Sequence, residues 1–313
     1  MKNVIEPWGV NVPFLILAFI YFAIGGVSLN LDPSVHGFFM FLGAYSLYSG
    51  MILRLFFPAK KYLILHIVTL VLLSIPLYPF VSLSFFFLTI VEIWGLKDVK
   101  SYGSKFPINI LVLSSPPLSF ISWLLFPILG YNLLIISLLL YLLGINEGIF
   151  SATLGLKPKF GIKQIPILLL VFLFYLSYSL FPLIIIAYFA WLFYGVKKVR
   201  KNLSALSVIL SSASTSIGSY FLGETIHAFA LGTMAPFFYS CITYSTSRYN
   251  YDKIYIISIL LSLSYFLRFV YFHISGIFFV ASSLLFLYLI KDNLTLTTLK
   301  YGMSKKYLIK KLN

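Results

Sequence analysis

Two stretches of the chain place an acid and a histidine at the start of a long apolar run. Asp32 and His36 open the first stretch, and Glu224 and His227 open the second. Glu224 and His227 are three residues apart, so on a helix they share a face where the carboxylate can orient the imidazole. Haem iron and copper take imidazole ligands presented by rigid helices. We therefore interpret His36 and His227 as candidate haem or metal ligands, oriented by Asp32 and Glu224.

Two further candidate residues are Arg268 and His273. They lie near the ends of two later apolar runs, close to each other in the sequence. His273 is a third candidate cofactor ligand, although a histidine near a helix end also serves as an interfacial residue with its polar tip in water. Arg268 has three interpretations: it extends outward to water, pairs with Glu224 or Asp32, or holds an anionic group such as a haem propionate. We interpret two other ionisable groups, His66 and Glu92, as interfacial.

The composition determines the class of structure that must position these residues. Hydrophobic residues make up 60% of the 313 residues and charged residues 10%, whereas a soluble domain is about half apolar and a quarter charged. Most of the surface must therefore face lipid, where backbone groups have to be satisfied within helices or a closed barrel. The apolar runs are continuous and about twice as long as a barrel strand, which predicts an all-α, polytopic membrane protein.

A bilayer-spanning helix needs about 17–25 residues, and on that scale we expect about twelve transmembrane helices. Residues 62–96 are too long for one crossing of a core about 30 Å thick, so Pro76 and Pro79 predict a hairpin there. Leu180-Phe-Pro182 divides residues 164–197 in the same way, and Pro116-Pro117 interrupts the fifth span. The expected spans are 12–29, 36–57, 62–78, 80–96, 106–126, 130–150, 164–180, 182–197, 204–222, 225–246, 254–272 and 275–291.

The basic residues predict the orientation of these spans in the cell membrane. The net charge is +15, and we attribute it to cytoplasmic loops rather than to nucleic-acid binding. Lys and Arg gather in every second predicted loop and in the tail, and the intervening loops contain none. This alternation predicts that both termini are cytoplasmic, so that the three candidate histidines His36, His227 and His273 lie near the outer face.

We expect one transmembrane helical domain over residues 1–299, followed by a basic cytoplasmic tail at 300–313. The tail is either an interfacial helix on anionic lipid or a frayed end. Six spans on either side of residue 150, with a histidine opening the second and the tenth, suggest a repeat of 1–150 and 151–299. The single cysteine, Cys241, excludes an internal disulfide. Phosphate-binding loops of the Walker type and the common hydrolase motifs are absent from the sequence, so no catalytic residue is predicted.

Two segments carry a resemblance to known families. His36-Gly-Phe-Phe-Met-Phe-Leu-Gly43, with Gly50 and Arg54-Leu-Phe-Phe-Pro58, resembles the His-led second helix of NnrS-like and short haem–copper-oxidase-like membrane proteins. His227-Ala-Phe-Ala-Leu-Gly232 resembles a later helix of that group. The sequence departs from the pattern because no predicted helix carries a pair of histidines, so an oxidase core with a low-spin haem and a copper trio cannot be assembled.

The length, the Lys, Ile, Tyr and Phe usage and the scarcity of acids resemble the hydrophobic B subunit of the archaeal membrane b-type cytochrome. That resemblance implies a respiratory electron-transport role as anchor of a cytochrome subunit on the outer face. The resemblance implies haem b as the cofactor and quinol as a further ligand. It also implies contact with membrane lipid. The implied cofactor-binding residues are His36, His227, His273, Arg268 and Glu224. The alternatives are a secondary transporter of a small solute, since about twelve spans with proline-broken helices are typical of that class, and a passive membrane scaffold.

Overall fold

The structure is a computed structural model and describes residues 6–97 and 109–306. Every regular element in these residues is helical, which confirms the all-α prediction. The chain divides into two compact units. Of the described residues, unit 1 holds 6–97, 112–138 and 292–306, and unit 2 holds 109–111 and 139–291. These units do not coincide with the suggested repeats, 1–150 and 151–299, and the repeat stays a prediction.

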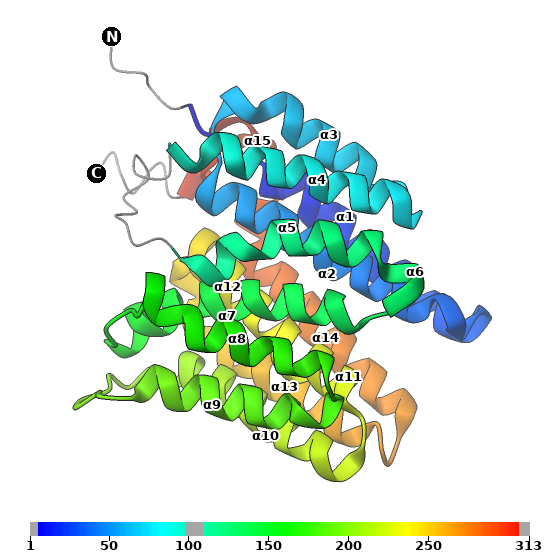
Figure 1. Ribbon diagram of the computed structural model, residues 1–313, viewed down its shortest axis with the longest axis vertical. Helices are drawn as coiled ribbons and strands as arrows, with labels where there is room; N and C mark the ends of the chain where they lie inside the picture. Colours follow the sequence, from blue (N-terminus) through cyan, green and yellow to red (C-terminus); the bar gives the residue numbers. More distant parts are fainter. Residues whose placement is uncertain (1–5, 98–108, 307–313) are drawn as a thin grey trace. The chain divides into compact units, whose positions relative to one another are not determined.

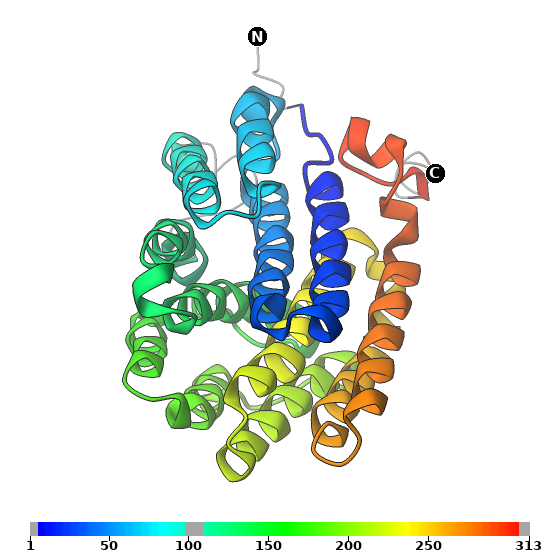
Figure 2. The same ribbon diagram turned by 90° about the vertical axis from the view of Figure 1, so that its right-hand side faces the viewer.

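Unit 1 is built on a helical hairpin of α1 (Asn11–Leu31) and α2 (Pro33–Phe56), which lie side by side in Figure 2. A single extended residue, Asp32, joins the two helices, and its Oδ1 accepts a hydrogen bond of 3.0 Å from the backbone N–H of Ser34. This cap and the proline that follows it start α2. The other elements of the unit are α3 (Leu63–Leu73), α4 (Tyr78–Gly95), most of α5 (Ile110–Leu124), α6 (Phe126–Leu129), the start of α7 (Asn132–Leu154) and α15 (Leu296–Tyr301).

The two ends of the described chain meet within unit 1. The backbone N–H of Gly9 donates to the carbonyl of Leu299 at 2.9 Å, and Arg54 donates to the carbonyl of Gly302 at 3.1 Å. A Cβ on Gly9 would lie 2.3 Å from the carbonyl oxygen of Thr298, so only glycine allows this approach. The segment before α1 and the segment after α14 (Phe272–Ile290) are therefore held together.

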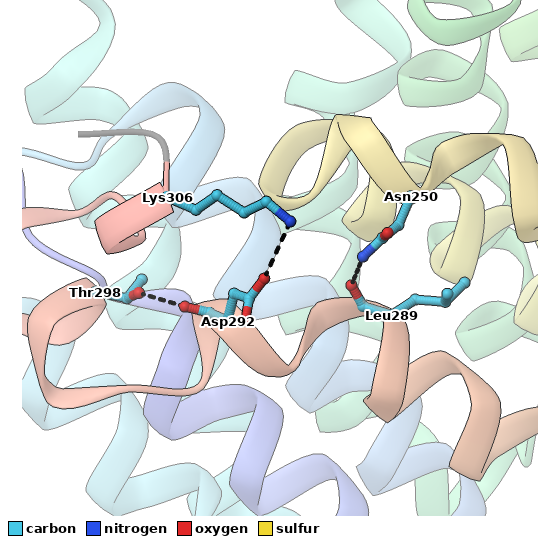
Figure 3. A network of polar contacts seen from close by, with 5 residues as sticks. All are labelled: Asn250, Leu289, Asp292, Thr298 and Lys306. Atoms are coloured by element: carbon cyan, nitrogen blue, oxygen red, sulfur yellow. Dashed lines mark hydrogen bonds and ion pairs between the residues drawn. The ribbon is translucent and has the colours of Figure 1, made fainter. Parts of the chain in front are cut away.

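The first residues of the predicted basic tail, 300–313, follow α15 in an ordered arrangement. Lys306 Nζ lies 3.9 Å from Asp292 Oδ2, and the Thr298 hydroxyl donates to the Asp292 carbonyl at 3.4 Å (Figure 3). These contacts favour an ordered tail over a frayed one as far as residue 306. Residues 307–313 of the tail lie outside the described residues.

Unit 2 contains the rest of α7 and the helices from α8 to α14, labelled in Figure 1. Within it, Asn250 Nδ2 donates to the carbonyl of Leu289 at 2.6 Å (Figure 3) and ties the loop before α13 to the end of α14. Cys241 is buried inside α12, as expected for a small apolar side chain. The helices of the unit are α8 (Ile165–Phe172), α9 (Phe181–Phe193), α10 (Leu203–Leu222), α11 (Thr225–His227), the π-helix η6 (Ala228–Met234), α12 (Ala235–Thr246), α13 (Ile254–Leu267) and α14 (Phe272–Ile290).

Each of the twelve predicted spans contains a helix in the structure. The predicted hairpin at Pro76 is confirmed, because α3 ends at Leu73 and α4 begins at Tyr78. Within residues 6–97 and 109–306, seven helical segments are long and apolar enough to cross a membrane, so the chain is a multi-pass helical membrane protein. They are Asn11–Leu31, Pro33–Phe56, Tyr78–Gly95, Asn132–Leu154, Leu203–Leu222, Thr225–Thr246 and Phe272–Asn293.

The proline pair of the fifth predicted span does not end the helix, because α5 continues through Pro116 and Pro117. Proline at position 116 removes the N–H that would bond the carbonyl of Val112 in an α-helix. The hydroxyl of Ser115 donates to that carbonyl instead, at 2.6 Å. A local side-chain donor therefore replaces the missing backbone donor and the helix persists.

Candidate functional site

The acid and the histidine that open the segment 225–246 form a pair in unit 2. His227 Nδ1 lies 2.9 Å from Glu224 Oε2, and both side chains are partly exposed. Since a carboxylate accepts, Nδ1 is the donor, and the neutral ring then carries its lone pair on Nε2. Metal-ligating histidines are commonly oriented in this way, by a carboxylate on the other ring nitrogen. The predicted geometry of Glu224 and His227 is confirmed.

Arg268, at the end of α13, lies near this pair. The guanidinium is half-buried, within electrostatic range of Glu224 and of Tyr265, and its Cζ lies 5.7 Å from the centre of the Phe272 ring. No ion pair within 4.0 Å joins it to Glu224 in the described part of the chain. Tyr265 is fully buried, and its hydroxyl has no hydrogen-bond partner among the described residues. Arg268 and Tyr265 therefore lie within electrostatic range of Glu224, the carboxylate that orients His227.

The helix changes its winding directly after His227. Residues Ala228–Met234 form a π-helix, and α12 follows without a break. A π-helical stretch inserts extra backbone into a helix and occurs often at functional sites. This stretch packs against α10, where Gly232 approaches Thr215. The π-helix therefore separates His227 from the regular helix α12.

His36 belongs to unit 1 and is oriented differently from the prediction. Its Nδ1 lies 2.7 Å from the carbonyl oxygen of Gly25 on α1, so Nδ1 donates and Nε2 carries the lone pair of the neutral ring. Asp32 does not orient it, because Asp32 Oδ1 accepts from the backbone N–H and the hydroxyl of Ser34. The prediction that Asp32 orients His36 is wrong, because the Asp32 carboxylate caps the start of α2.

The other two histidines are poorer candidates for ligation. His273 is exposed at the start of α14, with an edge-on contact to the Phe272 ring. His66 is fully buried, and its Nδ1 accepts a hydrogen bond of 3.1 Å from the indole N–H of Trp8. An indole only donates, so neutral His66 carries its proton on Nε2 and has no lone pair there. The structure corrects the interfacial interpretation of His66.

These residues do not assemble a metal site of several protein ligands. In residues 6–97 and 109–306, no three His, Cys, Asp or Glu side chains come together as a metal-binding group. An axial haem ligand requires a single imidazole, and the donor chemistry of His227 fits that role, with Arg268 suited to a propionate. His36 also fits the role of an axial haem ligand, because its neutral ring carries the lone pair on Nε2. His36 lies in unit 1 and the other predicted site residues lie in unit 2.

Two buried acids were not among the predicted site residues. Glu147, in α7, is fully buried, and it accepts from the backbone N–H of Lys159 and from Gln164 Nε2. Glu92, in α4, is 6% exposed, and its Oε2 has no partner among the described residues. The Glu92 carboxylate is therefore buried against the protein and does not extend into water, and its interfacial depth stays a prediction. Both acids lie within apolar runs, and an ionisable residue inside a membrane span is itself the signal that singles them out.

Comparison of the chain with models of protein families, with curated proteins and with solved structures found no match.

Proposed function

We propose that the chain is an integral-membrane subunit of a respiratory electron-transfer complex of the b-type cytochrome kind. In this role it anchors an extracytoplasmic cytochrome subunit, and His227 serves as a haem ligand or a quinol-binding group near the outer face. The observation that carries the proposal is the hydrogen bond of 2.9 Å from His227 Nδ1 to Glu224, with Arg268 in electrostatic range. A haem held there would supply one-electron redox chemistry.

The proposal includes twelve crossings of the cell membrane, with both termini cytoplasmic. The contact between Gly9 and Leu299 supports an even number of crossings, because it holds the segment before α1 and the segment after α14 together. Seven crossings would put those segments on opposite sides. The additional crossings are the short helical segments, including Ile110–Leu124, Gly161–Tyr175 and Tyr178–Phe193. In this topology His36 and His227 lie toward the outer face and the basic loops lie inside.

A haem assay on the purified chain tests the ligand role. We expect protein isolated from its native membrane in mild detergent to give a pyridine haemochrome spectrum of haem b. The His227→Ala variant is expected to lose that haem, because the Nε2 ligand is gone. Glu224→Gln is expected to keep the haem and shift its midpoint potential, since Glu224 acts on the iron only through the imidazole.

His273→Ala is the matched control, because His273 is an exposed histidine of the same unit with no carboxylate to orient it. We expect its haem content to equal that of the wild type. A wild-type chain without haem, or a His227→Ala variant with an unchanged spectrum, would refute ligation by His227. A cytochrome chain that co-purifies with the wild type supports the anchoring role, and its absence from the purified native complex contradicts that role.

A secondary transporter is the second candidate, and one observation favours it. The apolar segment 225–246 is not a regular helix, because it contains the π-helix η6 beside small and polar residues of α10. Irregular helices often line the substrate site of transporters. Ion-coupled uptake of a small solute into proteoliposomes, with no haem on the protein, would select this function over the first.

A further inference from the structure

The short helix α15 and the turn after it expose apolar side chains and bury polar ones. Leu296 is 83% exposed, Tyr301 51% and Met303 37%. Thr298 and Ser304 of the same segment are fully buried. A helix whose outer side meets water has the opposite arrangement, with its apolar side chains turned inward and its polar side chains outward. The outer side of this segment is therefore suited to an apolar environment.

Lysines accompany these apolar side chains. Lys300 lies one turn after Leu296 on the same face of α15, and its Nζ lies 5.3 Å from the centre of the Tyr301 ring. Lys305, after the end of the helix, is also exposed. A lysine beside apolar groups can lay its aliphatic stem along them and extend its ammonium group to polar surroundings. The outer side of the segment therefore combines apolar and cationic groups.

The segment is also positive overall. Residues 292–306 contain three lysines and one acid, Asp292. The Asp292 carboxylate lies 3.9 Å from the ammonium group of Lys306 (Figure 3), and its backbone carbonyl accepts from the hydroxyl of Thr298. The acid is therefore paired with a lysine outside α15, and the charge that α15 itself carries is positive.

Hydrogen bonds within unit 1 hold α15 at one end of the hairpin of α1 and α2. The carbonyl of Leu299 accepts from Gly9, two residues before α1, and the carbonyl of Gly302 accepts from Arg54 in the last turn of α2. Arg54 also donates to Asn11 Oδ1, at the start of α1, at 2.9 Å. Both helices are long and apolar enough to cross a membrane, so the start of α1 and the end of α2 lie at one membrane surface. The helix α15 lies at the same level.

We propose that the outer side of α15 binds the anionic phospholipid headgroups of the leaflet at that end of unit 1. This α15 lipid face consists of Leu296, Lys300, Tyr301, Met303 and Lys305. Its apolar side chains would enter the boundary between headgroups and acyl chains, and its lysines would contact the phosphates. The contacts of α15 with the rest of unit 1 preform the face, so little ordering opposes binding. In the proposed topology the leaflet is the cytoplasmic one. This role does not depend on haem binding by His227.

A fluorescent probe on the α15 lipid face tests what covers it. The full chain with Leu296→Cys and Cys241→Ala is labelled with an environment-sensitive dye and reconstituted into vesicles of phosphatidylcholine and phosphatidylglycerol. A nitroxide carried on either lipid, close to the headgroup, quenches the dye on contact. We expect labelled phosphatidylglycerol to quench more strongly than an equal amount of labelled phosphatidylcholine. Salt at about 1 M, where the Debye length is ~3 Å, is expected to remove this preference.

Two double variants measure the contribution of the lysines. Lys300→Gln with Lys305→Gln is expected to lower the preference for phosphatidylglycerol at the dye by up to about fivefold for each lysine. Lys197→Gln with Lys198→Gln is the matched control, because it removes two exposed lysines from a loop of unit 2. The preference at residue 296 should be unchanged in this control. An equal loss in both double variants would show that only the net charge of the protein attracts the lipid, and would contradict a specific α15 lipid face.

Leu31, the last residue of α1, is the matched control position for the dye. It is 80% exposed, and residues 12–53 contain no Lys or Arg. A dye on Leu31→Cys should be quenched equally by the two lipids. Equal quenching at residue 296, or quenching there only by iodide in the water, would overturn the proposal. A dye at residue 296 that is already shielded from iodide in detergent would show that a protein segment or a second copy covers this face, which would also overturn it.

Discussion

Replacing Glu147 with alanine is expected to produce one of the largest losses of stability among single substitutions in this protein. Glu147 Oε2 accepts a hydrogen bond of 2.6 Å from Gln164 Nε2, and Oε1 accepts from the backbone N–H of Lys159. Each buried donor left without a partner costs about 1–3 kcal/mol, so the two donors together cost roughly 2–6 kcal/mol. The loss arises from the donors, because a methyl group cannot accept either bond.

Glu147 belongs to a network that attaches the loop before α8 to the start of α5 and to the second half of α7. Gln164 Oε1 accepts from the backbone N–H of Ile110 at 2.7 Å, and Gln164 Nε2 also donates to Asn109 Oδ1 at 3.0 Å. Asn109 Nδ2 in turn donates to the carbonyl of Gly144 at 2.6 Å. The loss of Glu147 is therefore expected to loosen residues 155–164 as well as to lower the melting point.

Lys159, in the same loop between α7 and α8, attaches that loop to the end of α9. Its ammonium group donates to the carbonyls of Trp191 and Tyr194 at the end of α9. Partial burial lowers the pKa of Lys159, and the nearby carboxylate of Glu147 opposes that shift. Without Glu147 the lysine keeps its carbonyl partners but loses the opposing charge. We therefore expect the loop of Glu147→Ala to become sensitive to cleavage by a lysine-specific protease.

The single cysteine offers a direct measurement. Cys241 is buried in unit 2, so a thiol-reactive fluorogenic dye reports unfolding of that unit on heating in detergent. Glu147→Ala should lower the midpoint strongly, and Glu147→Gln less, since its amide keeps one acceptor. Asp252→Ala is the control, because Asp252 is an exposed acid of the same unit and should change stability by less than about 0.5 kcal/mol. Equal midpoints for Glu147→Ala and Asp252→Ala would contradict the prediction.

Gly232→Ala is the second substitution for which we expect a large effect. A Cβ at this position would lie 1.7 Å from Thr215 Oγ1 and 2.4 Å from Thr215 Cβ. Thr215 is buried on α10, and its hydroxyl bonds the carbonyl of Ser211, so the side chain has little room to turn. Overpacking of a tight interior typically costs 1–3 kcal/mol, and we expect about 3 kcal/mol here because the contact is so short.

A double-mutant cycle tests this contact with the same Cys241 readout. Thr215→Gly lowers stability by itself, since glycine costs about 1 kcal/mol in a helix. In that background Gly232→Ala should cost nothing, because the obstructing atoms are gone. Gly276→Ala in α14 is the control, since its Cβ would meet nothing within 4 Å. Additive losses in the cycle would show that Gly232 and Thr215 do not constrain each other.

The packing face of α10 differs in part from the face that its small residues predict. Small residues recur on α10 at spacings of three and four, which predicts a close-packing stripe of Ser207, Ser211, Ser214 and Gly218. Ser211 accepts a hydrogen bond of 2.7 Å from Ser262 on α13, and Gly218 faces Phe266. Ser214, however, is exposed and donates to the carbonyl of Ser211 in its own helix. The prediction that α10 packs closely against another helix is confirmed. The face that packs includes Ser211 and Gly218 but not Ser214.

Local properties of the chain were sufficient to predict the helices, the break at Pro76 and the pair formed by Glu224 and His227. Hydropathy, proline stereochemistry and a spacing of three residues act within one or two helical turns. The partners of Glu147 and His66, and the isolation of Glu92, depend on residues distant in the sequence. A helix in lipid is apolar on every side, so its residues do not reveal which face meets another helix. Only the packed structure decides which of these buried groups find hydrogen-bond partners.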